Sequence, residues 1–161
     1  MKNEVLHTIP PFWDASSEIL ILGSFPSVKS RETAFFYGHP QNRFWRVLAE
    51  IYGSEVPRSV EEKKSLLRLN RVALWDVIYS CSIEGSADSS ISDVVPNDVA
   101  SIVNNSRIKK IFVNGKTADR LYKKFLEPVL KRSATVLPST SPANAAWSVE
   151  KLVSAWRCIE L

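Results

Sequence analysis

The 161-residue sequence has too few cysteines for several classes of protein. Its two cysteines, Cys81 and Cys158, cannot form a disulfide framework, a four-cysteine zinc site or a four-cysteine iron–sulfur cluster. A chain with so little cysteine is typical of a reducing, intracellular environment.

Long hydrophobic runs are also missing. No apolar run approaches the roughly 18–20 residues of a membrane span. The first nine residues carry Glu4 and His7 where a signal peptide would need an apolar stretch. We therefore expect a cytoplasmic protein with access to DNA and no membrane partner.

The overall composition is that of an ordinary globular domain. The chain is 45% hydrophobic and 24% charged, which excludes disorder, collagen and coiled coil. Its length fits one domain, and we find no internal repeat, low-complexity tract or linker. The prediction is a single domain over residues 1–161.

The net charge of +4 is unevenly distributed. The segment 107–132 has nine basic and two acidic residues, a balance of +7, so the rest of the chain carries −3. On a helix from Lys116 to Leu126, four of these basic side chains share one face: Lys116, Arg120, Lys123 and Lys124. This face is either an ordinary solvated surface or a binding surface for nucleic-acid phosphates.

Short apolar runs alternate with helical patterns along the chain. Four runs are typical of buried strands: Ile19–Leu22, Val72–Val77, Lys110–Val113 and Ala134–Leu137. Five segments have helical patterns: Asn42–Tyr52, Ser59–Leu69 (with Ser59 as N-cap), Val94–Val103, Lys116–Leu126 and Asn144–Trp156. The segment Ser80–Ser92, which contains Gly85, is predicted to be a surface loop. This alternation predicts an α/β fold, a three-layer α/β/α sandwich with a central, mainly parallel four-stranded sheet.

The segments that follow the predicted strands are rich in polar, aromatic and glycine residues. In open α/β sheets, ligands bind beyond the carboxyl ends of the strands. The strings that follow the first and last strands are GSFPS (Gly23 to Ser27), FFYGHPQNRFW (Phe35 to Trp45) and PSTSPAN (Pro138 to Asn144); Asp76 and Asn114 end the other two. Aromatic rings, amides and hydroxyls on one rim suit a planar heterocycle and a phosphate.

These three strings, in this order, resemble the uracil-DNA glycosylase superfamily, specifically its hypoxanthine-DNA (deoxyinosine) glycosylase branch. The resemblance implies an α/β/α fold and base-excision repair. The protein would flip a deaminated base out of DNA and hydrolyse its N-glycosidic bond. The candidate bases are hypoxanthine and/or uracil, with xanthine as a further candidate. The resemblance further implies no metal, no cofactor and, as partner, DNA that contains deaminated bases; we expect a monomer.

The chain departs from patterns common in that superfamily. Phe25 stands where many members carry an Asp or Asn that positions the attacking water, and Ser139 and Thr140 stand where a His-Pro pair is usual. Asn42 is then the best candidate for the catalytic polar group. As a neutral amide it would orient water or the sugar, since it cannot act as an ordinary general base.

The remaining candidate residues have roles in binding. Asn114 is expected to act with Asn42 in catalysis, through contact with the base. The base-binding candidates are Gly23, Ser24, Phe25, Asp76 and Tyr37, with Tyr37 stacking on the base. The candidates for a DNA wedge and phosphate contacts are Ser27, Lys116, Ser139, Thr140, Ser141, Pro142 and Asn144.

Alternatives remain at several of these positions. Asp76 is either a loop cap or a nucleotide contact, Asn114 either a turn residue or a base contact, and Asn42 can also cap its helix. A non-catalytic nucleic-acid-binding module would equally explain the basic face and the aromatic loops. A serine hydrolase is disfavoured, because GSFPS lacks the G-x-S-x-G elbow and neither histidine has an evident acidic partner in the sequence.

Overall fold

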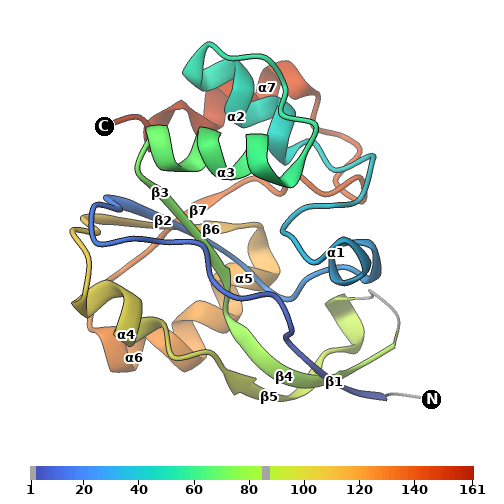
Figure 1. The fold of residues 1–161 in the computed structure, drawn as a ribbon. Helices are drawn as coiled ribbons and strands as arrows, with labels where there is room; N and C mark the ends of the chain where they lie inside the picture. The colour runs from blue at the N-terminus through green and yellow to red at the C-terminus, as the bar shows by residue number, and fades with distance from the viewer. Residues whose placement is uncertain (1–2, 85–87) are drawn as a thin grey trace.

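A four-stranded parallel sheet forms the centre of the molecule (Figure 1). The computed structural model describes residues 3–84 and 88–161. The sheet has the order β3-β2-β6-β7, with β2 at Ile19–Gly23, β3 at Val72–Asp76, β6 at Lys110–Asn114 and β7 at Thr135–Leu137. The predicted α/β fold and parallel sheet are confirmed.

Helices cover both faces of this sheet. In Figure 1, α2 (Phe44–Tyr52), α3 (Val60–Leu69) and α7 (Val149–Trp156) lie above it. Below it lie α4 (Val99–Asn104), α5 (Lys116–Leu121) and α6 (Glu127–Leu130). A short helix, α1 (Val28–Thr33), lies beyond the end of β2. No helix in the described part of the chain is long and apolar enough to cross a membrane.

Alternation along β2 divides the core into two layers. Ile19 and Ile21 pack with α2, α3 and α7, whereas Leu20 and Leu22 pack with the residues of α4 and α5. All four side chains are fully buried. A strand that is apolar at every position is what a sheet covered on both faces requires.

A second, antiparallel sheet was missed by the sequence prediction. β1 (Asn3–Leu6), β4 (Ile78–Ile83) and β5 (Ser92–Pro96) pair in the order β1-β4-β5. The loop predicted over Ser80–Ser92 is therefore wrong at both ends, although Gly85 lies outside the described residues. These strands are only four to six residues long, and β4 and β5 contain serines that are typical of loops, so no local pattern predicts their pairing.

Three predicted helices differ from the prediction in their bounds or their type. The pattern over Val94–Val103 begins as β5, and the helix starts only after Asp98, whose side chain caps it. α7 starts at Val149 with Ser148 as N-cap, rather than at Asn144. The basic helix ends as α at Leu121 and continues as a π-helical turn over Tyr122–Leu126. The Ser59 cap of α3 is confirmed.

Candidate active site

A cavity of about 690 Å³ opens at the carboxyl end of the parallel sheet. It lies where ligands of open α/β sheets bind. Its walls come from the loops after β2, β3, β6 and β7. It includes every predicted site residue except Lys116 and Asn144: Gly23, Ser24, Phe25, Ser27, Tyr37, Asn42, Asp76, Asn114, Ser139, Thr140, Ser141 and Pro142. The sheet topology therefore brings together residues more than a hundred positions apart in the sequence.

Gly23 leaves room for two polar groups. It pairs with Asp76 across β2 and β3. A Cβ added at Gly23 would collide with the Asp76 carboxylate and lie 3.1 Å from the Tyr37 hydroxyl oxygen. Any side chain at this position would displace one of the two, so glycine is required by close approach.

Tyr37 is held in an unusual backbone conformation, with φ at 53°. Such a left-handed angle in a non-glycine residue is strained and is often found at functional sites. Its ring stacks on Phe44 with centroids 4.0 Å apart, so only the opposite ring face is available for the stacking predicted for it. Burial and the Asp76 carboxylate raise the pKa of the hydroxyl, and the nearby Asn114 amide only partly opposes the rise.

Asn42 is oriented by the helix that follows it. Its Oδ1 accepts a hydrogen bond from the backbone N–H of Phe44 at 2.9 Å, although Arg43 occupies the N-cap position itself. Because a backbone N–H can only donate, this contact identifies the oxygen of the amide. The amide nitrogen, and the second lone pair of the oxygen, are left for the cavity.

Asn114 is fixed by a reciprocal pair of hydrogen bonds with Thr140. Its Nδ2 donates to the Thr140 hydroxyl at 3.0 Å, and its Oδ1 accepts from the Thr140 backbone N–H at 3.1 Å. The second N–H of Nδ2 remains available on the cavity wall. Thr140 is completely buried, so it orients Asn114 and is not placed to bind a DNA phosphate as its predicted role required.

Arg43 is a functional residue that the sequence prediction missed. Its guanidinium donates to the carbonyls of Ser141 at 2.7 Å, Asn144 at 3.1 Å and Trp147, and its Nε donates to that of Thr140 at 3.3 Å. Arg43 is 9% exposed. This clamp joins the loop between β7 and α7 (residues 138–148, the late loop) to the segment that carries Asn42. The signal available in the sequence was an arginine directly before two aromatic residues, which are buried in the structure.

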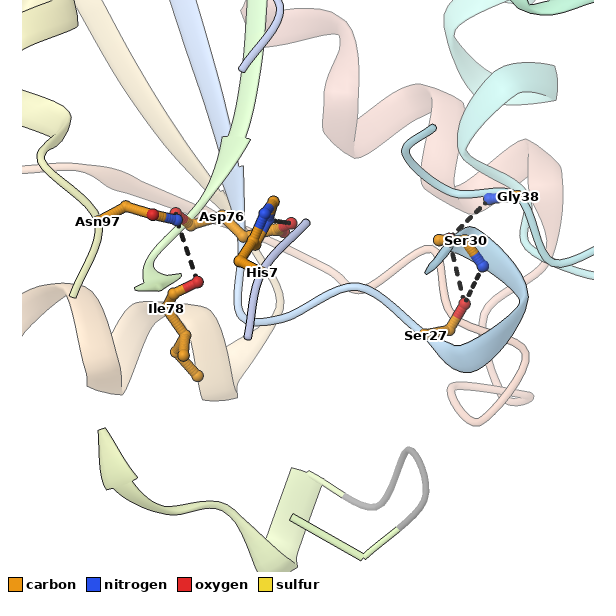
Figure 2. Close-up of polar contacts among 7 residues, drawn as sticks. All are labelled: His7, Ser27, Ser30, Gly38, Asp76, Ile78 and Asn97. Carbon is orange, nitrogen blue, oxygen red and sulfur yellow. Dashed lines mark hydrogen bonds and ion pairs between the residues drawn. The ribbon is translucent and has the colours of Figure 1, made fainter. Parts of the chain in front are cut away.

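Ser30, another residue that the sequence prediction missed, joins the loop around Ser27 to the loop around Gly38 (Figure 2). Ser27 caps α1 by accepting from the Ser30 N–H at 3.1 Å and donates to the Ser30 hydroxyl. That hydroxyl accepts from the Gly38 N–H at 2.9 Å. Ser27 therefore has a structural role, while it also lines the cavity.

His7 is the third missed residue and lies just beyond β1. Its Nε2 lies 2.8 Å from Asp76 Oδ2, and both side chains are almost fully buried (Figure 2). The expectation that neither histidine has an acidic partner is wrong for His7. Its ring otherwise contacts the rings of Phe25, Phe36 and Trp75.

The remaining late-loop and basic residues differ in accessibility. Asn144 donates to the Ser139 carbonyl at 3.0 Å and lies outside the cavity wall. Lys116 is exposed at the start of α5, also outside that wall. On the predicted basic face, Lys123 is paired with Asp119 at 3.1 Å. No cluster of three or more His, Cys, Asp or Glu side chains that could hold a metal occurs within residues 3–84 and 88–161.

Comparisons with known proteins agree with this geometry. The family model for the uracil DNA glycosylase superfamily matches residues 10–160. A hypoxanthine DNA glycosylase from Methanosarcina acetivorans is 37% identical over 155 residues, which is 93% of this chain and 94% of the relative. One from Methanosarcina barkeri is 33% identical over 152 residues, or 91% and 92% of the two chains.

A solved structure extends the likeness to the fold. The solution NMR structure of a protein from Methanosarcina acetivorans, described as a candidate uracil DNA glycosylase, has a TM-score of 0.80, with 36% identity over 94% of this chain and 93% of that one. The parallel sheet covered by helices on both faces, with a cavity at its carboxyl end, is an α/β architecture that this solved structure shares over nearly the whole chain. The chain belongs to the uracil DNA glycosylase superfamily, and the resemblance to its hypoxanthine branch is confirmed.

Proposed function

We propose that this DNA glycosylase removes deaminated bases by hydrolysing the N-glycosidic bond, leaving an abasic site. The observation that carries the proposal is the single cavity wall on which Asn42, Asn114 and the residues around Gly23 meet. The relatives named hypoxanthine DNA glycosylases favour hypoxanthine as the first substrate to test, ahead of uracil and xanthine. We further propose that residues 1–161 act as one domain and as a monomer, inside the cell.

Asn42 and Asn114 would stabilise opposite charges in the transition state. Cleavage develops positive charge on the sugar and negative charge on the departing base, and preorganised groups can stabilise both. The free lone pair of Asn42 Oδ1 would orient water or the sugar. The remaining N–H of Asn114 would donate to a carbonyl of the base, with Thr140 holding it in place.

DNA would be held at the rim while the base is flipped into the cavity. Extrusion costs a few kcal/mol and is easiest at mismatches. The hydroxyls of Ser139 and Ser141 and the exposed ammonium group of Lys116 would bind phosphates. Pro142 would act as the wedge. Duplex affinity should then fall at least tenfold between about 50 and 200 mM salt. Salt-insensitive binding would contradict the phosphate contacts.

Duplexes that carry one hypoxanthine, uracil or xanthine, or a thymine mismatch, test the reaction through alkali-labile abasic sites. We expect Asn42→Ala to reduce the single-turnover rate by about 100-fold or more, and the exposed neighbour variant Gln41→Ala to retain it. Unchanged rates in both Asn42→Ala and Asn114→Ala would refute these roles. If the wild-type protein cleaves none of the duplexes, the alternative of a non-catalytic nucleic-acid-binding module is favoured.

A further inference from the structure

The polar groups beside Gly23 form a pattern that fits one edge of a deaminated base. We propose that Asp76 and Tyr37 read the lactam edge of the extruded base, and that His7 is a positioning residue that holds Asp76 for this purpose. The proposal rests on the proposed function, because it assigns the residues that select the base in the same cavity.

Asp76 presents one carboxylate oxygen for a ligand. Oδ2 accepts from the Nε2–H of His7 at 2.8 Å, and the Asn97 side chain fixes the backbone carbonyl of Asp76 at 2.9 Å. No hydrogen bond to Oδ1 occurs within the described segments 3–84 and 88–161. Oδ1 lies against Gly23 on the cavity wall. An ionised carboxylate can only accept hydrogen bonds, so Oδ1 requires a donor on the ligand.

Tyr37 supplies the complementary donor. Its hydroxyl oxygen is buried and has no hydrogen bond among the described residues, although the Asn114 amide lies close enough to lower its pKa. A buried hydroxyl without a partner is unfavourable, and because Tyr37 belongs to the cavity wall, a ligand in the cavity would supply the partner. Because burial raises its pKa, the hydroxyl stays protonated and can donate.

This pair would separate hypoxanthine from adenine, and uracil from cytosine. Hypoxanthine has N1–H as a donor and O6 as an acceptor, which match Asp76 Oδ1 and the Tyr37 hydroxyl. Adenine has a lone pair at N1, which would face the carboxylate without a proton between them, and an amino group at C6. Uracil has the same lactam pattern as hypoxanthine, whereas cytosine does not. Guanine shares this edge, so its exclusion would depend on the cavity around its 2-amino group.

His7 would act only through Asp76. Its Nε2–H occupies Oδ2, so the carboxylate is fixed with Oδ1 towards Gly23. The ring is wedged against Phe25 and Trp75, with centroids 5.9 and 6.4 Å away. Glutamine at this position retains an N–H donor, whereas phenylalanine retains the ring volume and removes the donor.

The test compares duplexes with a single deoxyinosine or a single deoxynebularine, whose purine base lacks both N1–H and O6. We expect Asp76→Asn to lower the ratio of single-turnover rates, deoxyinosine over deoxynebularine, by about 10- to 100-fold. Tyr37→Phe should slow deoxyinosine excision more than deoxynebularine excision, and so lower the same ratio. Equal losses on both substrates in both variants would overturn the assignment.

The His7 variants test the positioning role. His7→Phe should lower the same ratio, and His7→Gln should restore most of it; an unchanged ratio in folded His7→Phe would refute the role. Calorimetric titration with free hypoxanthine and free purine measures the preference without cleavage. If the wild-type protein excises no base but binds hypoxanthine more tightly than purine, and Asp76→Asn loses this preference, only the proposed reaction fails. If the wild-type protein excises hypoxanthine and Asp76→Asn keeps the full preference, only the present proposal fails.

Discussion

Replacing the Arg43 guanidinium should loosen the late loop and disable the site together. Arg43→Met retains an aliphatic chain of similar reach but removes donors to four carbonyls, those of Thr140, Ser141, Asn144 and Trp147. Hydrogen bonds from a charged group contribute about 1.5–3 kcal/mol each, but they are not additive, and three of these carbonyls belong to partly exposed residues. We expect a loss of about 2–4 kcal/mol in the free energy of unfolding.

The loss is measurable by thermal unfolding. At about 2–4 °C per kcal/mol for a chain of this size, Arg43→Met should lower Tm by about 5–15 °C. Arg43→Lys keeps the charge without the planar fork and should be intermediate. Arg46→Met, on the exposed side of α2, is the matched control and should stay within about 0.5 kcal/mol of wild type.

Catalysis provides the second readout for Arg43. At a temperature where the variant remains folded, displacement of Thr140 would release Asn114, and an ångström of misplacement can reduce a rate by about 100-fold. If Arg43→Met has the Tm and the excision rate of the wild-type protein, the role of Arg43 in holding the late loop is refuted.

Two further predictions concern other contacts. Thr140→Val removes the hydroxyl that accepts from Asn114 Nδ2, and it should slow excision at least tenfold with only about 1 kcal/mol of destabilisation. Thr140→Ser keeps the hydroxyl and should retain activity. Equal single-turnover rates of the two variants would contradict this prediction. Hydrogen bonds from Arg71 and Lys109 lower the pKa of Glu18 from its ordinary 4.5, so its contribution to stability is present above that pH and lost as the pH falls through the lowered pKa. Acid titration of Tm should therefore be shallower for Glu18→Gln, and an identical profile would be inconsistent with this pairing.

The sequence was sufficient for the central sheet and for most of the cavity wall. Strand β2 is apolar at consecutive positions, which predicts its burial on both faces. Parallel strands bring the residues at their carboxyl ends, such as Asp76 and Asn114, to the same edge of the sheet. The antiparallel sheet was not predicted, because the serines of β4 and of the segment that follows it are typical of a surface loop.

The missed residues His7 and Arg43 depend on contacts between segments that lie far apart in the sequence. His7 reaches Asp76 because its backbone N–H donates to the Tyr79 carbonyl at 2.7 Å, which continues the β1–β4 pairing by one residue. No spacing rule joins positions 7 and 76. Arg43 likewise contacts carbonyl groups, which every residue possesses, so no particular partner could be read from the late loop.

The span of the Arg43 clamp has a consequence for synthesis of the protein. Its four side-chain contacts join residues 97 to 104 positions apart. On the ribosome, the strands before residue 114 can emerge while the cavity still lacks its last wall. A nascent chain therefore cannot complete this cavity until the segment through Trp147 has left the exit tunnel.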